Sequence, residues 1–588
     1  MRAILRIAAT LFIIVIFTLK VTAQIKISQR MLVKIYLENK EEVHRLDDMA
    51  LDFATLKIEE FAQVVVTQSE LNEINLRGFL TEVIAYPDRA HIVDPEYHTY
   101  EEVLVLMDSL ANVYPDITKL DTIGESQELG LVIQAMKISD NPGIEEDEPA
   151  ILFDGLHHAR EPVSMESCLA ILEHLLINYG TDTTVTNWVD NIEIWIIPLL
   201  NPDGWKYVVE ENLANPWWRK NQRDNNENGT FDPDYDGVDI NRNYDYNWAI
   251  GGSGDPSSWT YRGPAPFSEK EAQAKRDLAL SQKFVLSISY HSHGEIVIYS
   301  WSDVPPAPDQ QLIIDIADSI ASRIPLFSSG GSYEPTSSNC TNGFSRCWMY
   351  VVAGSLEYTV ETAPEFIPPG PDGIQIAQDN VAGALYLLDR VFGPGLTGHI
   401  TDAFTGEPLL ATVKVLEIFD PVLTPRTSDE LYGRYFRLLL PGTYSIEISK
   451  EGYETVTVNN VQVNPGYLTQ LDVQMDSTMT SADKREIGVK ISGKYVLHQN
   501  YPNPFSSQTV ISYQLPINSK VSLKIYNILG EEITILVDAE QKAGEYSVIW
   551  DGKDSSGGDL NSGFYIYSLE AENNFSVSEQ SKKIFLIR

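Results

Sequence analysis

The most constraining feature of this chain is a set of short, nearly all-apolar runs separated by segments of helical periodicity. Residues 149–154, 192–200 and 285–290 are such runs, and the last is diluted only by two small serines. Strands that are apolar throughout are typical of a mostly parallel sheet with helices covering both faces. The sequence therefore predicts an α/β domain, which we place at residues 97–391.

The chain is too long, at 588 residues, to form a single domain. Residues 24–93 mix strand-like runs with charged, helix-prone segments, and we interpret them as a small α+β pro-segment or accessory domain. Residues 396–475 show short alternating strands and turns, which suit a small β-sandwich. Residues 476–493 are polar and weakly patterned, as in a linker, and residues 494–588 are again rich in strand patterns.

The N-terminus carries the pattern of a secretory signal. Within residues 1–23, Arg2 and Arg6 precede an apolar stretch, and Val21-Thr-Ala23 offers a small-residue cleavage site. A membrane anchor is the alternative, but the apolar stretch is short and interrupted by a lysine. We find no other stretch suited to spanning a bilayer, so we expect an exported mature chain without a transmembrane segment. The net charge of −40 argues against nucleic acid as a partner.

The chain has three cysteines. Cys340 and Cys347 lie seven residues apart in a loop rich in Gly, Ser and Asn. Outside the cytosol such a pair predicts a small disulfide, in preference to a zinc site, because no further cysteine is near. Cys168 lies on the apolar face of a helical segment, which predicts a buried thiol.

Potential metal ligands follow two of the predicted buried strands. His158 and Glu161 come after the strand that ends at Asp154, and His291 closes the strand 285–290. Open α/β sheets bind ligands at the carboxyl ends of their strands. Two histidines and a glutamate form the ligand set of a catalytic zinc ion whose fourth position is left for water. Taken singly, a polar loop and a core histidine explain the same residues.

Three further motifs supply groups that a peptidase requires. Arg219 offers a guanidinium for a developing oxyanion. Asn241 and Arg242 offer donors that can grip a carboxylate in two-pronged fashion. Glu361, at the end of a predicted strand, can act as a general base. Each motif alone is weak, since Arg and Glu usually lie on solvated surfaces.

Together these motifs resemble the zinc metallocarboxypeptidases of the carboxypeptidase A/T type. Six of them occur in the order seen in that family: His158-Ala-Arg160-Glu161, Asn201-Pro-Asp-Gly204, Trp218-Arg219-Lys220, Val238-Asp239-Ile-Asn241-Arg242-Asn243, Ser289-Tyr-His291-Ser292 and Thr359-Val-Glu361. The resemblance covers about residues 97–391. It implies a mixed, mainly parallel eight-stranded sheet flanked by helices, and an enzyme that hydrolyses C-terminal residues from peptides.

The resemblance implies a role for each matching residue. The two histidines and Glu161 would hold one zinc ion, with Asp239 supporting His158 as a hydrogen-bond acceptor. Glu361 would activate the zinc-bound water, and Arg219 would stabilise the tetrahedral oxyanion. The residues that would bind the substrate are Arg160, Asn241, Arg242, Tyr333 and Arg346.

Two of these substrate-binding assignments fall where the chain departs from the family. The family's mobile tyrosine precedes an Asp-Trp pair, which here reads Cys347-Trp348, and Tyr333 is the nearest tyrosine upstream. The residue two before that Trp often lines the floor of the specificity pocket, and here it is Arg346. We expect Arg346 to favour peptides ending in Asp or Glu by charge pairing. The alternative is that the longer loop turns Arg346 to solvent.

An Asx-rich segment resembles the first half of a calcium-binding loop. Oxygen-bearing side chains alternate along it, with a glycine at the sixth position, but Tyr235 occupies the twelfth position, where a bidentate Glu is expected. A solvated turn is the alternative. The candidate calcium ligands are Asp224, Asn226, Asn228 and Asp232.

The C-terminal third resembles two further families. Residues 396–475 are similar to carboxypeptidase regulatory-like domains of transthyretin type. Residues 494–588 resemble the C-terminal sorting domains of bacterial type IX secretion cargo, through Tyr501-Pro-Asn-Pro-Phe505 and Trp550-Asp-Gly-Lys-Asp554. This resemblance implies the bacterial secretion machinery as a partner and a secreted or surface-attached location. A generic immunoglobulin-like module is the alternative.

Three functions follow from these motifs. The first is an exported zinc carboxypeptidase that acts on peptides with a free C-terminus. The second is a cell-wall peptide amidase or peptidase of the same fold, and the third is an inactive surface binding protein. The presence of Glu161, Arg219 and Glu361 argues against the third. Asn241 and Arg242 suit a free carboxylate and favour the first over the second.

Overall fold

The computed structural model describes residues 30–588 except 48, 58–59, 87–93, 211–214, 301–305, 328, 339, 341–342, 419, 479–495, 499, 501–502, 504, 506–507, 516–517, 528–529, 543, 573–576 and 587. The predicted signal peptide and most of the predicted linker lie outside the described residues. The chain forms two compact units, divided after Asp476. Within the described residues, no helix is both long enough and apolar enough to cross a bilayer.

The first described segment, called the N-terminal unit from here on, is a small α+β part of the first compact unit. Strands β1 (Met31–Tyr36), β2 (Asp52–Lys57), β3 (Phe61–Val66) and β4 (Thr81–Ala85) form an antiparallel sheet in the order β2-β3-β1-β4, accompanied by α2 (Lys40–Asp47) and α3 (Gln68–Leu76). The β-branched side chains of β3 suit a half-buried strand. Helix α3 begins at a capping box, in which Thr67 and Glu70 satisfy each other's backbone amides.

The central domain is built on an eight-stranded mixed sheet in the order β11-β10-β12-β9-β7-β8-β6-β5. Its strands are β5 (Thr118–Glu125), β6 (Val132–Ile138), β7 (Ala150–Asp154), β8 (Glu193–Ile197), β9 (Leu286–Ser292), β10 (Ile296–Ser300), β11 (Glu334–Ser338) and β12 (Leu356–Thr362). The neighbouring strands β8, β7, β9 and β12 are parallel. This arrangement confirms the predicted mixed sheet, and it brings the carboxyl ends of β7, β9 and β12 to one edge.

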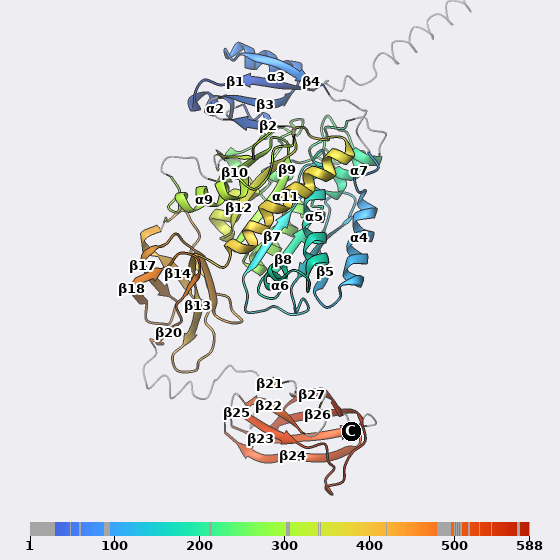
Figure 1. Cartoon of the computed structure of the whole chain (residues 1–588), viewed down its shortest axis with the longest axis vertical. Helices are drawn as coiled ribbons and strands as arrows, with labels where there is room; N and C mark the ends of the chain where they lie inside the picture. Colours follow the sequence, from blue (N-terminus) through green and yellow to red (C-terminus); the bar gives the residue numbers. More distant parts are fainter. Residues whose placement is uncertain are drawn as a thin grey trace, which may run out of the picture. The chain divides into compact units, whose positions relative to one another are not determined.

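Helices cover both faces of this sheet. Ile151 and Phe153 pack in a core that includes α5, whereas Leu152 packs in a second core that includes α8. Because neighbouring strand residues point to opposite faces, one apolar run supplies both cores. Figure 1 shows α5 and α11 lying over one face. The helices are α4 (Tyr100–Val113), α5 (Pro162–Asn178), α6 (Thr183–Val189), α7 (Pro202–Glu210), α8 (Lys270–Gln282), α9 (Gln310–Ala321), α10 (Ser345–Trp348) and α11 (Gly370–Arg390).

The regulatory-like segment is a β-sandwich of two sheets, β16-β13-β19 with β20 beside β13, and β15-β14-β17-β18. Inward-facing Leu396, Ile400, Ile446 and Ile448 are fully buried between them. The strands are β13 (Gly395–Asp402), β14 (Thr412–Val415), β15 (Arg426–Thr427), β16 (Arg434–Leu438), β17 (Gly442–Ser449), β18 (Val456–Val463), β19 (Leu468–Gln470) and β20 (Val473–Met475).

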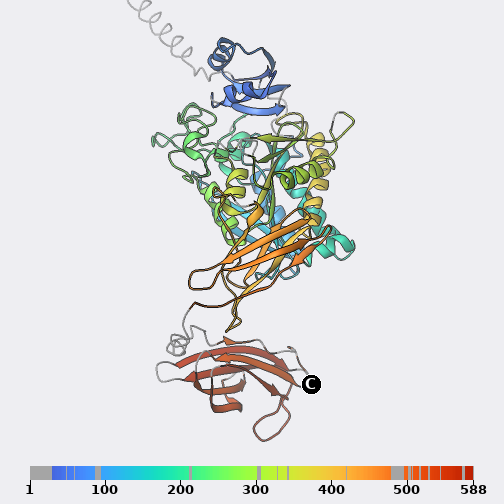
Figure 2. The same cartoon turned by 90° about the vertical axis from the view of Figure 1, so that its left-hand side faces the viewer.

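The second compact unit is also a sandwich of two antiparallel sheets, β21-β22-β25 and β24-β23-β26-β27 (Figure 2). Its core contains Ile511, Leu523, Trp550 and Tyr567. The strands are β21 (Val496–Leu497), β22 (Thr509–Leu515), β23 (Ser519–Asn527), β24 (Glu532–Gln541), β25 (Gly544–Trp550), β26 (Gly563–Glu572) and β27 (Val577–Leu586).

Candidate active site

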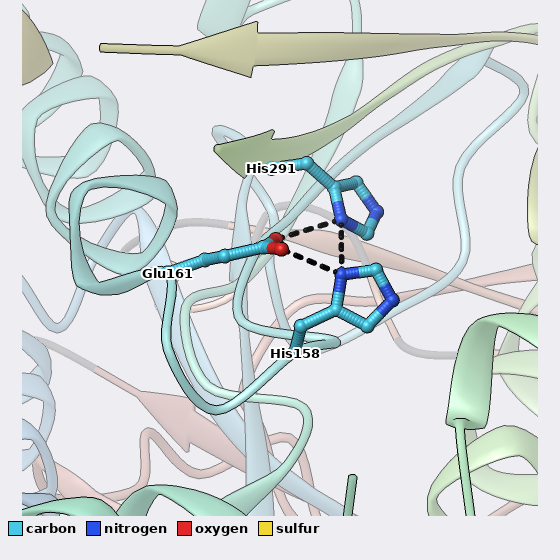
Figure 3. Close-up of side chains that lie close together, drawn as sticks. All are labelled: His158, Glu161 and His291. Carbon is cyan, nitrogen blue, oxygen red and sulfur yellow. Dashed lines mark hydrogen bonds and ion pairs between the residues drawn. The ribbon is translucent and has the colours of Figure 1, made fainter. Parts of the chain in front are cut away.

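Three side chains converge where β7 and β9 end (Figure 3). His158 and Glu161 lie in the turn between β7 and α5, where Pro162 begins the helix, and His291 is on β9. Nδ1 of His158 lies 2.8 Å from Oε1 of Glu161, and Nδ1 of His291 lies 2.9 Å from Oε2. The two Nδ1 atoms are 3.1 Å apart.

The chemistry of this donor set fits a divalent metal ion. All three side chains are buried, and their ligand atoms lie within 4.8 Å of one another. Burial disfavours the Glu161 carboxylate, but the two histidines outweigh it and lower the pKa of Glu161, so that it is ionised. Burial lowers the pKa of His291 to about 4 against the opposing effect of Glu161, which leaves a neutral imidazole. One glutamate carboxylate and two histidine ring nitrogens form a ligand set that is typical of catalytic zinc.

Asp239 holds several of the predicted residues in place. Its Oδ1 lies 3.3 Å from Nε2 of His158 and accepts the backbone N–H of Asn241 at 3.0 Å. Its Oδ2 accepts from Nε of Arg219 at 2.8 Å. Although burial raises the pKa of Asp239, Arg219 and Arg242 outweigh it and hold the carboxyl ionised. The structure therefore sets the Asp239 carboxylate within ion-pair distance of the ring nitrogen of His158 for which the sequence predicted it as acceptor.

A cavity of about 100 Å³ joins these residues to the other predicted groups. Glu361 reaches it because β12 pairs in parallel with β9, in a register that sets Glu361 beside His291. Burial and the nearby Glu161 raise the pKa of Glu361, whereas Arg219 acts in the opposite direction. The predicted site residues that line the cavity are His158, Glu161, Arg219, Asn241, Arg242, Arg346 and Glu361.

Arg346 lies on α10 and is only 4% exposed, so it does not turn to solvent. Its guanidinium lies 4.2 Å from the ring centroid of Phe344, and its Nε has no hydrogen-bond partner among the described residues. Burial and the nearby Arg242 lower the pKa of Arg346 to about 10, which leaves it charged at neutral pH. Arg346 lies within the segment that the disulfide between Cys340 and Cys347 closes.

Two predicted substrate-binding residues are absent from the residues that line the cavity. Tyr333 is buried, and its hydroxyl accepts a hydrogen bond from Asn380 of α11 at 3.3 Å. Arg160 is also fully buried, with its guanidinium 4.0 Å from the ring centroid of Phe366. Arg160 is instead engaged by a residue of the N-terminal unit.

That residue is Asp52, which the sequence did not predict for this site. Its carboxylate accepts from both terminal nitrogens of Arg160, at 2.7 and 2.8 Å, and lies 3.2 Å from Nη1 of Arg219. Thr55, on the same strand, donates to the backbone oxygen of His293 at 2.7 Å. The side of the cavity formed by the N-terminal unit is made of residues 50, 51 and 53–56. A lone Asp in a strand carries no motif that could have pointed to this contact.

The predicted calcium ligands accept hydrogen bonds from the loop's own backbone. Asp224 accepts from the amide of Gly229 at 2.7 Å, and Asn228 accepts from that of Thr230 at 2.8 Å. Asn226 and Asp232 likewise accept from amides two residues ahead. These are the contacts of an Asx-rich turn, the alternative given above.

The chain is similar to known proteins over the domain that holds these residues. The profile described as zinc carboxypeptidase matches residues 103–383. Carboxypeptidase B of Astacus astacus is 30% identical to the chain over 273 residues, which span 45% of this chain and 86% of that protein. The chain belongs to the zinc carboxypeptidase family.

Other known proteins also resemble the chain. Carboxypeptidase D of Homo sapiens is 30% identical over 389 residues, which make up 62% of this chain but only 26% of that protein, so the chain spans about a quarter of its length. Carboxypeptidase A from Helicoverpa armigera shares the fold, with a TM-score of 0.50 and 21% identity over 61% of this chain and 99% of that one. Residues 395–476 match the carboxypeptidase regulatory-like domain, and residues 503–574 match the FlgD Ig-like domain.

Proposed function

We propose that this zinc carboxypeptidase family member removes single residues from the C-termini of peptides in a zinc-dependent reaction. One observation carries the proposal: the His158, Glu161 and His291 cluster opens into a cavity that also holds an arginine–amide pair suited to a carboxylate, Arg242 and Asn241. Binding a terminal carboxylate beside a metal ion is what distinguishes a carboxypeptidase from a peptidase that cleaves within a chain.

Each residue then has a chemical task. Zinc, when bound, polarises the scissile carbonyl and lowers the pKa of water. Asn241 and Arg242 bind the terminal carboxylate and set the last peptide bond against the metal ligands. Glu361 takes the proton of the attacking water and passes it to the leaving amine. Arg219, fixed by Asp239, stabilises the negative charge that develops on the carbonyl oxygen.

A peptide panel with mass readout, run with and without a zinc chelator, tests the proposal. We expect chelator-sensitive loss of single C-terminal residues and a fall of at least about 100-fold with Glu361→Gln. Loss of residues that is unaffected by Glu361→Gln would refute the mechanism. Including cell-wall peptides with blocked C-termini separates the amidase alternative, and zinc binding without hydrolysis of any peptide would indicate a binding protein.

We also propose that the enzyme prefers peptides ending in Asp or Glu. Arg346 supports this preference, because it is a buried cation at the cavity wall whose Nε is unsatisfied. A carboxylate side chain of the substrate would supply the missing acceptor in a desolvated setting, where such pairs are strong. Rates for peptides ending in Glu, Phe and Lys test it, and a strong preference for Phe or Lys would contradict it.

We propose that residues 24–93 act as a pro-segment that restrains the enzyme. The support is the two-pronged hydrogen bond from Arg160 to Asp52, together with the six N-terminal residues that line the cavity. A substrate that enters from this side has to displace them. Limited proteolysis between residues 24–93 and the catalytic domain, followed by activity measurements, tests whether this segment restrains the enzyme.

We propose export through the signal peptide at residues 1–23, followed by secretion or surface attachment directed by residues 494–588. The two-sheet immunoglobulin-like unit supports a separable C-terminal module. Deleting residues 494–588 is expected to trap the protein inside the cell envelope. Unchanged export of the truncated chain would leave the generic immunoglobulin-like module as the better description.

Calcium binding by the Asx-rich loop stays a proposal with a direct test. Its support is the alternating oxygen-bearing side chains around Gly229, which adopts a positive φ of 77°. Chelation should lower the melting temperature, and calcium but not zinc should restore it. A melting temperature that does not respond to calcium leaves the solvated turn as the explanation.

A further inference from the structure

A buried ionic cluster lies beneath the active site. Nζ of Lys275, on α8, donates to Oδ2 of Asp154 at 2.7 Å and to Oε2 of Glu357 at 2.8 Å. The side chains of all three residues have no exposed area. Lys275 thus links helix α8 to two strands of the sheet, through Asp154 of β7 and Glu357 of β12.

The alternation of side chains along the strands explains why this cluster meets the site. Asp154 and Leu152 are on the face of β7 that packs toward α8. On β12, Glu357 and Glu361 are four residues apart and therefore share a face. On β9, Ser289 and His291 share a face for the same reason. The cluster and the catalytic groups consequently occupy one side of the sheet.

One chain of contacts, which we call the first branch, runs from Asp154 through Ser289 to the proposed metal ligand His291. Ser289 donates to Oδ1 of Asp154 at 2.9 Å, and its oxygen lies 3.4 Å from Nε2 of His291 and 3.3 Å from Nδ1 of His157, so it can accept from His291. A proton held on Nε2 leaves the lone pair of Nδ1 directed at the metal site. His157 borders the same branch, with its Nδ1 3.2 Å from Asp154 and its ring stacked 5.2 Å from that of His291.

The second branch leads to the carboxylate-binding amide. Oγ of Ser345 donates to Oε1 of Glu357 at 2.7 Å, and the backbone N–H of Ser345 donates to Oδ1 of Asn241 at 2.9 Å. This contact fixes which end of the Asn241 amide faces the cavity. The two branches end side by side, since Nδ2 of Asn241 lies 3.3 Å from Nε2 of His291. With the proton on Nε2 both atoms are donors, so this approach is a packing contact and not a hydrogen bond.

We propose that Lys275 is a positioning residue that sets both the metal ligand His291 and the substrate-binding residue Asn241. The inference rests on the proposed function for the roles of those two residues. Without the lysine, Asp154 and Glu357 would face each other as two buried carboxylates, and their repulsion and desolvation would break the contacts to the serines. Ser289 and Ser345 would then no longer be held in place, and the contacts that orient His291 and Asn241 would be lost.

A matched control exists in the same sheet. Lys137 on β6 donates to Glu193 on β8 at 2.6 Å, and both side chains are almost completely buried. Neither residue lines the cavity. Lys137→Met therefore breaks a buried ion pair of similar kind and depth without touching either branch, and it reports the purely structural cost.

The test compares Lys275→Met, Lys137→Met, Ser289→Ala and Ser345→Ala in the full chain. The readouts are the zinc dissociation constant of the metal-free protein, by competition with a coloured chelator, and KM and kcat on a peptide with a free C-terminus. We expect Lys275→Met to weaken zinc binding about 10-fold to 100-fold and to raise KM. Ser289→Ala should weaken zinc binding alone, Ser345→Ala should raise KM alone, and Lys137→Met should change neither.

The proposal is overturned if Lys275→Met retains wild-type zinc affinity and KM, or if Lys137→Met reproduces its losses. If Lys275→Met does not fold, the two serine variants decide the question. A change in zinc affinity for Ser289→Ala alone and in KM for Ser345→Ala alone supports the two branches. The same change in both variants, or no change in either, refutes them. The zinc measurement needs no turnover. A wild-type chain that binds zinc but hydrolyses nothing would therefore refute the proposed function while leaving the metal branch open to the same measurement.

Discussion

Replacing Asp52 with alanine should activate the unprocessed chain. In the structure Asp52 makes a two-pronged hydrogen bond to Arg160 and approaches Arg219, and the three side chains are almost fully buried. Burial raises the pKa of Asp52, but the two arginines outweigh it and keep the carboxyl ionised, so the full ion pair operates at neutral pH. The substitution removes the anion that links the N-terminal unit to two arginines of the catalytic domain.

The size of the effect follows from this geometry. Removing one partner of a buried, hydrogen-bonded ion pair costs about 3–5 kcal/mol. Since every 1.4 kcal/mol is a factor of ten, the closed arrangement loses at least about 100-fold in its population relative to the open one. Hydrolysis by the unprocessed chain should rise by that factor, or until it reaches the rate of the catalytic domain freed by limited proteolysis.

The assay is the initial rate of peptide hydrolysis by intact, freshly purified protein, with mass analysis to show that no cleavage has occurred. Glu73→Gln is the control within the same unit, because it breaks an exposed ion pair between Glu73 of α3 and Arg77, which caps that helix. The melting temperature of each variant checks that the catalytic domain remains folded. Two results would refute the reasoning: unprocessed wild-type protein already as active as the freed domain, or Asp52→Ala no more active than wild type.

Three further predictions concern other parts of the molecule. Arg346→Ala should lower the rate for Glu-ended relative to Phe-ended peptides by about tenfold or more, given 1.5–3 kcal/mol for a charged hydrogen bond; an unchanged ratio would contradict the role of Arg346. Burial and the nearby Glu269 raise the pKa of Glu271 to about 8. The folded state then holds a proton that the unfolded state releases, so the contribution of Glu271 to stability falls as the pH rises from about 4.5 to 8. Urea unfolding should show Glu271→Gln gaining on wild type across that range, and a constant difference would rule this out. Zinc at 1,000 times its dissociation constant should add about 4 kcal/mol to the free energy of unfolding, and chelation should lower the melting temperature accordingly.

The parts of the site that the sequence predicted depend on local patterns. His158 and His291 each follow a recognisable buried strand, and strand ends in parallel sheets meet at one edge, so their convergence could be expected. Glu361 follows from the same rule applied to β12. The eight-stranded sheet was predicted through the resemblance to a family, because apolar runs alone do not specify strand order.

The parts that were missed depend on pairings between distant segments. Asp52 is 108 residues from Arg160, and nothing near either residue indicates the other. Lys275 lies in a charged helical segment that is typical of a solvent-facing helix, yet the fold buries it completely between two carboxylates. Tyr333 was assigned as the nearest tyrosine upstream of Trp348, and that position in the sequence does not determine that its hydroxyl meets Asn380 in the core.

The register of β7 and β9 also dictates when zinc can be captured during folding. The two histidines are 133 residues apart, and β8, α7 and α8 are synthesised between the strands that carry them. A nascent chain that ends at α8 contains His158 and Glu161 but not His291. Once β9 has been synthesised, His291 still cannot reach the other two ligands until β9 pairs with β7. Zinc uptake is therefore a late folding event that reports closure of the sheet, and it stabilises the native topology only after that topology has formed.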